Sequence, residues 1–140
     1  MIERALAESE VSPLGRAKLL PAMIEITVAC GKLDAGAAAA AELDTVTETY
    51  TSPALVAAAA LGRGRLELAR GRGKEALVEL HRARRIWGEI ELPFELARTR
   101  ALLARAYSLL GEPAAAELEE QAAQATLRRI GAISIPVSHP

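Results

Sequence analysis

Two kinds of residue recur along this chain at one shared interval, and this recurrence limits the folds open to it more than any other feature. A proline series consists of Pro13, Pro53 and Pro93, and a glycine series consists of Gly31, Gly71 and Gly111. The spacing is constant within each series and identical between the two. Two independent markers with one period indicate an internal repeat. The chain therefore divides into three units, residues 13–52, 53–92 and 93–132.

Each unit has the signals of two helices joined by a short turn. Proline suits the first turn of a helix, where its missing N–H loses no partner, and Ser12 and Ser52 can cap the first two of these helices. The glycine that follows in each unit can adopt the left-handed conformation that ends a helix. Asp34 is expected to cap the second helix of the first unit, and Pro113 to begin that of the third. The second helices are predicted at about residues 34–50, 74–88 and 114–130.

The composition of the chain favours helices throughout. Apolar residues make up 51% of it and aromatic residues only 3%, so alanine and leucine must fill the core, and alanine has the highest helix propensity. We predict an all-α fold in which three antiparallel helix hairpins stack as a short solenoid. Pro21 should kink or split the first helix. Residues 1–12 are expected to form an N-terminal cap, with Ile2 and Leu6 facing inward, and residues 133–140 a disordered tail.

The charge of the chain and its single cysteine exclude several classes of function. The formal net charge is −1, with both signs interspersed, whereas an autonomous nucleic-acid binder is strongly basic. We therefore expect no direct nucleic acid binding by this segment. Cys30 alone supports neither an intrachain disulfide nor a multi-cysteine zinc site, and its apolar neighbours predict a buried, unreactive thiol. No stretch has the pattern of a signal peptide or of a membrane span, so we expect a soluble cytoplasmic protein without membrane contact.

The segment LGRGRLELARGRGKEAL, residues 61–77, is rich in glycine and arginine and raises two functional alternatives. A phosphate-binding loop needs a preceding strand and a Ser or Thr after its Gly-Lys pair, but Lys74 is followed by Glu75. An arginine-rich arm for nucleic acid would need aromatic residues that stack on bases, and the segment has none. We interpret its glycines as structural: Gly64 lets the paired helix approach closely, and Gly71 lies in the turn between helices.

Residues that could carry catalysis or bind a metal do not form a constellation. His81 stands among arginines and is predicted on a solvated face, and His139 lies in the tail. Neither has an acidic or cysteine neighbour at metal-ligand spacing. General acid–base catalysis needs carboxylates held in a pocket, whereas Glu117, Glu119 and Glu120 are predicted on the solvated face of one helix. We therefore predict no enzymatic activity, no cofactor and no metal site.

Trp87 is the only tryptophan of the chain and has two interpretations. In the first, Trp87 wedges between the second and third units together with Ile90, Leu92 and Phe94, because large aromatic side chains dominate such junctions. In the second, its ring stacks on a ligand. Core packing is the favoured interpretation.

One face of the predicted solenoid carries charged residues that could bind a partner. In a stack of helix hairpins, the first helices line the concave surface where partners usually bind. The charged residues expected there are Lys18, Glu25, Arg65, Arg98 and Arg105. Arg98 and Arg105 are separated by two helical turns and so project from one side of their helix. Two interpretations stay open: a mildly basic groove for an acidic peptide, and a solvated helix face without a partner.

The pattern of small residues resembles that of the tetratricopeptide repeat, in which a small residue on the first helix precedes a glycine by seven positions and alanines mark the closest packing on the second helix. The third unit matches with Leu103, Ala104, Tyr107, Gly111, Ala116 and Ala123, the second with Gly64, Gly71, Ala76, Leu80 and Ala83, and the first with Ile24, Gly31, Gly36 and Leu43. Arg63, Glu67 and Glu120 stand where this repeat usually has apolar residues, and the period exceeds the usual ~34. The lysine and asparagine set with which some of these repeats bind chaperone tails is not present as a set.

The whole stretch from Pro13 to about Ala132 also resembles one group of proteins that contain such repeats. Segments such as SPALVAAAALGRGRLELARGRGKEALVELHRARRIW are similar to the helical-repeat region of large LuxR/MalT-type bacterial transcriptional regulators. There the region transmits or senses a signal between a nucleotide-binding part and a C-terminal helix-turn-helix. The resemblance implies a protein-interaction or signal-transmitting module in transcription regulation. Neither flanking part is recognisable here, so we expect either a fragment of such a regulator or a short stand-alone relative.

A self-associating scaffold is a function of a different class. The last predicted helix carries Leu118, Leu127 and Ile130, and no further helix is predicted after it. These apolar side chains could pair with a second copy of the chain. We therefore expect a homodimer through the terminal helices as the alternative to a protein or acidic peptide partner.

Overall fold

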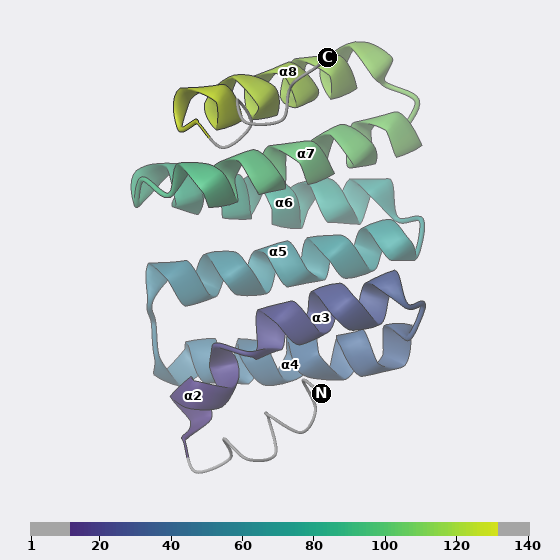
Figure 1. Cartoon of the computed structure of the whole chain (residues 1–140). Coiled ribbons are helices and arrows are strands. Elements are labelled where there is room, and N and C mark those ends of the chain that lie inside the picture. Colours follow the sequence, from purple (N-terminus) through teal and green to yellow (C-terminus); the bar gives the residue numbers. More distant parts are fainter. Residues whose placement is uncertain (1–11, 132–140) are drawn as a thin grey trace.

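The computed structural model describes residues 12–131, which form seven helices and no strand (Figure 1). The helices are α2 (Pro13–Ala17), α3 (Leu20–Ala29), α4 (Leu33–Thr49), α5 (Pro53–Ala69), α6 (Gly73–Glu89), α7 (Pro93–Leu109) and α8 (Pro113–Arg129). The predicted all-α fold is therefore confirmed for this part of the chain. None of these helices is long and apolar enough to cross a membrane. The predicted tail and all of the predicted cap except Ser12 lie outside the described residues, as do Ile2, Leu6 and His139.

From α4 onward the helices follow one regular interval. Each helix is 17 residues long, and the connections between successive helices are of equal length. The helices therefore begin at a constant spacing, which is half that of the proline and glycine series. The bounds of α4, α6 and α8 lie within one residue of the predicted second helices.

The helices begin as predicted with one exception. The Ser12 hydroxyl accepts a hydrogen bond from the Gly15 N–H at 3.1 Å, and Ser52 caps α5 in the same way. Pro21 lies in the first turn of α3, and the break between α2 and α3 confirms the predicted split. The prediction for Asp34 is wrong, because Lys32 is the N-cap of α4 and Asp34 already lies in the first helical turn. There its negative charge interacts favourably with the positive end of the helix dipole.

Four turns share one geometry of helix termination. At the end of α5, Gly71 has φ of 76° and the Arg72 N–H donates to the Glu67 carbonyl at 2.8 Å. This pattern is a Schellman motif, which satisfies carbonyl groups at the helix end. The turns after α3, α6 and α7 repeat it. The exit of α4 differs, since its C-cap residue Tyr50 is extended, with φ of −111° and ψ of 96°.

Helix α5 occupies the centre of the described structure. It packs against α3, α4, α6 and α7, whereas α8 packs mainly against α7. From α3 onward consecutive helices run antiparallel, and α5 also contacts α3 and α7 directly (Figure 1). These three helices therefore form one layer, and α4, α6 and α8 lie against it.

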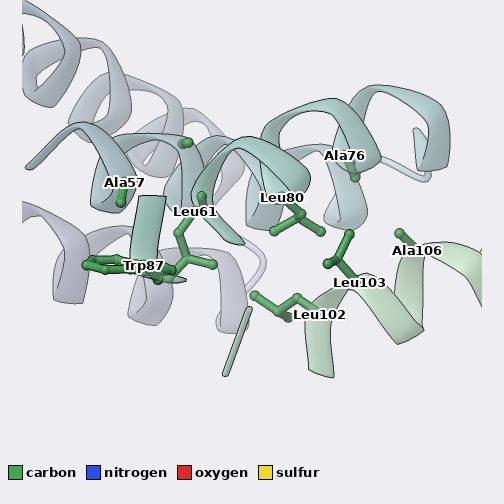
Figure 2. Close-up of a cluster of buried hydrophobic side chains, with 10 residues drawn as sticks. Ala57, Leu61, Ala76, Leu80, Trp87, Leu102, Leu103 and Ala106 are labelled. Atoms are coloured by element: carbon green, nitrogen blue, oxygen red, sulfur yellow. The ribbon is translucent and has the colours of Figure 1, made fainter. Parts of the chain in front are cut away.

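Two hydrophobic clusters fill the spaces on either side of α5. The first joins α5 to α2, α3 and α4, and the second joins it to α6 and α7. Figure 2 shows the second cluster, with Trp87 beside Ala57 and Leu61 at one end and Leu80 facing Leu103 at the other. Its alanines leave room for close helix packing. Burial is nearly complete at the alanines singled out from the sequence, namely Ala76, Ala83, Ala104, Ala116 and Ala123.

Gly64 has the packing role that the sequence predicted. A Cβ added at this position would lie 2.4 Å from Leu80 Cδ2, too close for non-bonded carbon atoms. Leu80 has no exposed surface and cannot move aside freely. The missing side chain of Gly64 therefore allows α6 to approach α5.

The three polar departures from the repeat pattern have separate explanations. Arg63 forms an ion pair with Asp44 of α4. Glu67 lies near the guanidinium groups of Arg70 and Arg72, at 3.7 and 3.6 Å. Glu120 is exposed, because within residues 12–131 α8 packs mainly against α7 alone.

Two predictions about side-chain burial are wrong. Cys30 is exposed because it is the C-cap residue of α3 and lies in the turn. Leu92 and Phe94 are 40% and 50% exposed, since they stand at the N-cap and in the first turn of α7 rather than between helices. Trp87 and Ile90, the other two residues of the predicted wedge, do pack in the second cluster.

Candidate functional site

A groove of about 320 Å³ lies along the layer formed by α3, α5 and α7. We call it the central groove. Four of its lining residues are apolar or small residues of α5 and α6 that form its floor, and the rest come from α5, from α7 and from the chain around the start of α3. The full set is Lys18, Pro21, Ala22, Glu25, Ala58, Leu61, Gly62, Arg65, Trp87, Glu95 and Arg98.

The floor of the central groove depends on small residues in the middle of α5. A Cβ added at Gly62 would lie 2.8 Å from Ile24 Cδ1 of α3, so Gly62 sets how closely α3 and α5 approach. Ala58 lies one turn earlier on α5 and also lines the groove. Trp87 is 4% exposed and belongs to the second hydrophobic cluster as well. The floor is therefore apolar and firmly packed.

The walls carry a network of charges that connects three helices. The Glu25 carboxylate of α3 accepts a hydrogen bond from Arg98 Nη2 of α7 at 3.0 Å. Its other oxygen lies 3.9 Å from Arg65 Nη2 of α5. Arg98 also lies 3.5 Å from Glu95, one turn earlier on α7, and its guanidinium carbon is 6.0 Å from the centre of the Phe94 ring.

Arg65 is the most enclosed of these charged groups, with 17% of its side chain exposed. Burial lowers the pKa of its guanidinium below the ordinary value, Glu25 raises it, and the charges of Arg98 and Arg105 lower it further. An arginine side chain keeps its proton under all ordinary conditions. The shift therefore reflects mainly the enclosure of Arg65, and the nearby positive charges of Arg98 and Arg105 add to it.

Four of the five charged residues predicted for the concave face lie together in the central groove, namely Lys18, Glu25, Arg65 and Arg98. Arg105 does not line it, although its charge acts on Arg65. Sequence reasoning missed Glu95, which its spacing of one helical turn from Arg98 could have indicated. It also missed the position of Trp87 in this groove, because Trp87 comes from α6, outside the layer of α3, α5 and α7.

A second hollow, of about 610 Å³, lies between α7 and α8 at the end of the described structure. Arg105 lines it together with Ala101, Ala104 and Leu109 of α7 and three residues of α8, among them Glu117 and Glu120. These two glutamates stand one repeat after Leu77 and Leu80, which α7 helps to cover. The hollow therefore corresponds to the place that α7 occupies on α6, but with an acidic edge.

Two residues that the sequence placed on solvated faces are partly enclosed where α6, α7 and α8 meet. His81 Nε2 lies 3.1 Å from the Tyr107 hydroxyl, and burial lowers the pKa of His81, with Arg84 adding to the effect and Glu119 opposing it. Glu119 has a 12% exposed side chain and binds Arg100 at 3.0 Å, with Arg84 at 3.8 Å. Both predictions of solvation are wrong because the neighbouring helices cover these side chains. Glu117 and Glu120 are exposed, as predicted.

The charged side chains of the central groove can bind a ligand. Across residues 12–131 no three His, Cys, Asp or Glu side chains converge so as to hold a metal ion. The central groove presents guanidinium donors beside an apolar floor, a combination suited to a ligand with both an anionic and an apolar part.

Comparison of the chain with protein-family models, with curated proteins and with solved structures found no match.

Proposed function

We propose that this chain is a non-catalytic protein-interaction module, a tetratricopeptide-like solenoid of three stacked helix hairpins whose central groove binds an acidic peptide segment of a partner. In this assignment α2 and α3 together form the first helix of the first hairpin, and α5 and α7 form those of the second and third. These first helices, which contact one another from hairpin to hairpin, would then line the concave surface, where such arrays bind peptides.

One observation carries the proposal. Three cationic side chains, those of Lys18, Arg65 and Arg98, converge on a groove with an apolar floor. They come from separate units of the repeat and so meet only in the folded chain. Among residues 12–131, the carboxylates of Glu25 and Glu95 line the groove with them. Guanidinium groups form the strongest hydrogen bonds with carboxylates, so the groove favours a peptide with acidic side chains.

The test uses a fluorescently labelled hexaglutamate peptide at low ionic strength, with anisotropy as the readout. The double charge reversal Arg98→Glu, Arg105→Glu should weaken binding about tenfold or more, because both lost charges lie in or beside the groove. The control Arg128→Glu, Arg129→Glu makes the same change in net charge in the last turn of α8, outside the groove. Equal losses in both variants, or no loss in either, would contradict a site in the groove.

A role in transcription regulation forms the second part of the proposal. It is supported by the resemblance of the stretch from Pro13 to about Ala132 to the helical region of LuxR/MalT-type regulators. In such a setting the groove would transmit a signal through a protein contact in the cytoplasm. The reading frame around this segment provides the test: a neighbouring helix-turn-helix is expected, and an isolated short frame would contradict this part.

The alternative function is a self-associating scaffold. It is favoured by the open α7–α8 hollow and by exposed apolar side chains of these two helices, since Leu109, which lines the hollow, is 50% exposed and Leu118 of α8 is 68% exposed. A homodimer through these terminal helices would cover both. Light scattering should then give twice the monomer mass at micromolar concentrations, and Leu109→Glu should restore the monomer. A monomer mass for the unchanged chain over that range would exclude the scaffold.

A further inference from the structure

We propose that Glu25 is an internal competitor in the central groove: its carboxylate occupies the place between Arg65 and Arg98 that a carboxylate of the acidic partner takes when it binds. This inference rests on the peptide-binding function proposed above. It assigns the recognition of the partner's carboxylate to Arg65 and Arg98. It also explains how the groove excludes weakly binding anions when no partner is bound.

The geometry of Glu25 is that of a bound carboxylate ligand. One oxygen accepts a hydrogen bond from Arg98 Nη2 at 3.0 Å, and the other faces Arg65 Nη2 at 3.9 Å. The two guanidinium groups come from different helices, α7 and α5, so only the packing of these helices brings both to the carboxylate. A single carboxylate shared by two arginines matches the way proteins recognise such groups.

Arg65 still has hydrogen-bond donors to offer. A guanidinium carries five N–H groups, and Arg65 makes an ion pair with Glu25 but no hydrogen bond to any side chain within residues 12–131. Its side chain is nevertheless only 17% exposed. A partner carboxylate that approaches closer than 3.9 Å would therefore gain a charge-assisted hydrogen bond that Glu25 does not provide.

Displacing Glu25 costs little. The Glu25 side chain is 48% exposed and its contact with Arg65 is long, at 3.9 Å, and the ion pairs of a half-exposed group contribute little to stability. Glu25 can rotate into water while α3 keeps its position, because α3 is held by Leu20 and Ile24 in the first hydrophobic cluster. The exchange of one carboxylate for another leaves the fold and the charge between the two arginines unchanged.

The experiment compares Glu25→Gln with the unchanged chain, using the labelled hexaglutamate peptide as the probe. Removal of the competitor should tighten binding about two- to fivefold, the range set by a weak ion pair. Glu48→Gln is the matched control, because Glu48 belongs to α4 and does not line the central groove. It removes the same charge and should leave the affinity unchanged. Thermal unfolding of each variant checks that the fold is retained.

The outcomes separate the inference from the proposed function. Tighter binding by Glu25→Gln alone supports the competitor. Equal affinity of Glu25→Gln and the unchanged chain, with binding still lost on reversal of Arg98 and Arg105, overturns the competitor and leaves the groove function in place. An equal gain in Glu25→Gln and Glu48→Gln also overturns it, since net charge alone would then explain the result. Absence of binding in every variant overturns the acidic-peptide groove itself.

Discussion

At the scale of single residues, the turn after α6 differs from its counterparts in one side chain. Glu91 has φ of 58°, where the equivalent turns have Gly31, Gly71 and Gly111 at 77°, 76° and 74°. A residue with a Cβ loses roughly 1 kcal/mol in this left-handed conformation. The Schellman hydrogen bond from the Leu92 N–H to the Trp87 carbonyl is kept at 3.0 Å. The backbone of this turn is therefore maintained against an unfavourable side chain.

Replacing Glu91 by glycine should stabilise the protein. We expect Glu91→Gly to raise the free energy of unfolding by about 0.5–1 kcal/mol, since the gain at positive φ exceeds the entropy that glycine loses on folding. The reverse change at an equivalent turn, Gly71→Ala, should lower it by about 1 kcal/mol. Urea unfolding followed by circular dichroism measures both. Destabilisation by Glu91→Gly would show that its side chain makes a favourable contact that outweighs the strain.

Replacing either of two glycines within helices by alanine should change the stability of the protein, in opposite directions at the two positions. Gly64→Ala places a Cβ 2.4 Å from Leu80 Cδ2, and overpacking of this kind costs about 1–3 kcal/mol. Gly88, near the end of α6, has nothing within 4 Å of an added Cβ, so Gly88→Ala should gain ~0.5–1 kcal/mol through helix propensity. Chemical denaturation of the two variants measures the difference. A gain in both would show that α5 and α6 separate readily, and a loss in both would contradict the prediction for Gly88.

The role of Gly64 could be predicted from the sequence and the role of Gly62 could not. Gly64 precedes Gly71 by the seven positions typical of the repeat, so its partner helix followed from the pattern. Gly62 faces Ile24 of α3, and that contact depends on how α3 lies on α5. The exposure of Cys30 was likewise unpredictable, because its apolar neighbours in sequence do not reveal that it ends α3.

At the scale of helices, α6, α7 and α8 meet around His81. The groups that face it are the Tyr107 hydroxyl from α7 at 3.1 Å, the Arg84 guanidinium from its own helix and the Glu119 carboxylate from α8. Burial and Arg84 both disfavour the charged imidazolium, and only Glu119 favours it. The folded protein therefore holds His81 neutral more strongly than the unfolded chain does.

This helix junction should make stability fall at mildly acidic pH. Since the folded pKa of His81 lies below the ordinary value of 6.5, the unfolded chain binds more protons in that range. The contribution of neutral His81 to the free energy of unfolding is complete above pH 6.5. It is lost as the pH falls from 6.5 through the pKa of His81 in the folded protein. His81→Gln should lack this part of the pH dependence. Urea unfolding at a series of pH values tests this, and identical slopes for both proteins would contradict it.

The helix bounds were largely predictable because their signals are local. Serine caps, prolines in first turns and glycines after last turns placed most helices within one residue. The end of α4 was harder to predict from the sequence, since Tyr50 ends this helix in an extended conformation without a glycine. The shorter interval between successive helices was also hidden, because α4 and α6 begin without proline and the turn after α6 uses Glu91. The proline and glycine series therefore mark each pair of helices and not each single helix.

At the scale of the whole molecule, the central groove could be predicted only in part. The charges of α3, α5 and α7 followed from the repeat, because Glu25, Arg65 and Arg105 occupy the same position of successive units. Which of them share one groove depends on the distance between helices, which no local pattern contains. Arg105 lies one repeat too far along and lines the end hollow instead. The repeat predicts a row of charged residues, and the packing of the helices determines which of them lie together.

The same packing predicts that stability is uneven along the stack. Helix α5 contributes to both hydrophobic clusters, so it cannot open without exposing both. Helix α8 packs mainly against α7, and its buried residues are Ala116, Ala123 and Thr126. Small side chains bury little apolar surface. In arrays whose elements contact only their neighbours, terminal elements open separately from the centre.

We therefore expect backbone amides of α8 to exchange with solvent deuterium through local opening, with a free energy at least about 1–2 kcal/mol below that of α5. Low concentrations of urea should reduce the opening free energy of α5 with the full slope of global unfolding and that of α8 with a smaller slope. The variant Leu103→Ala, within the second cluster, should lower protection in α5, α6 and α7 together. Equal free energies and slopes for α5 and α8 would instead show a single cooperative unit, and the end of the stack would then be as firmly held as its middle.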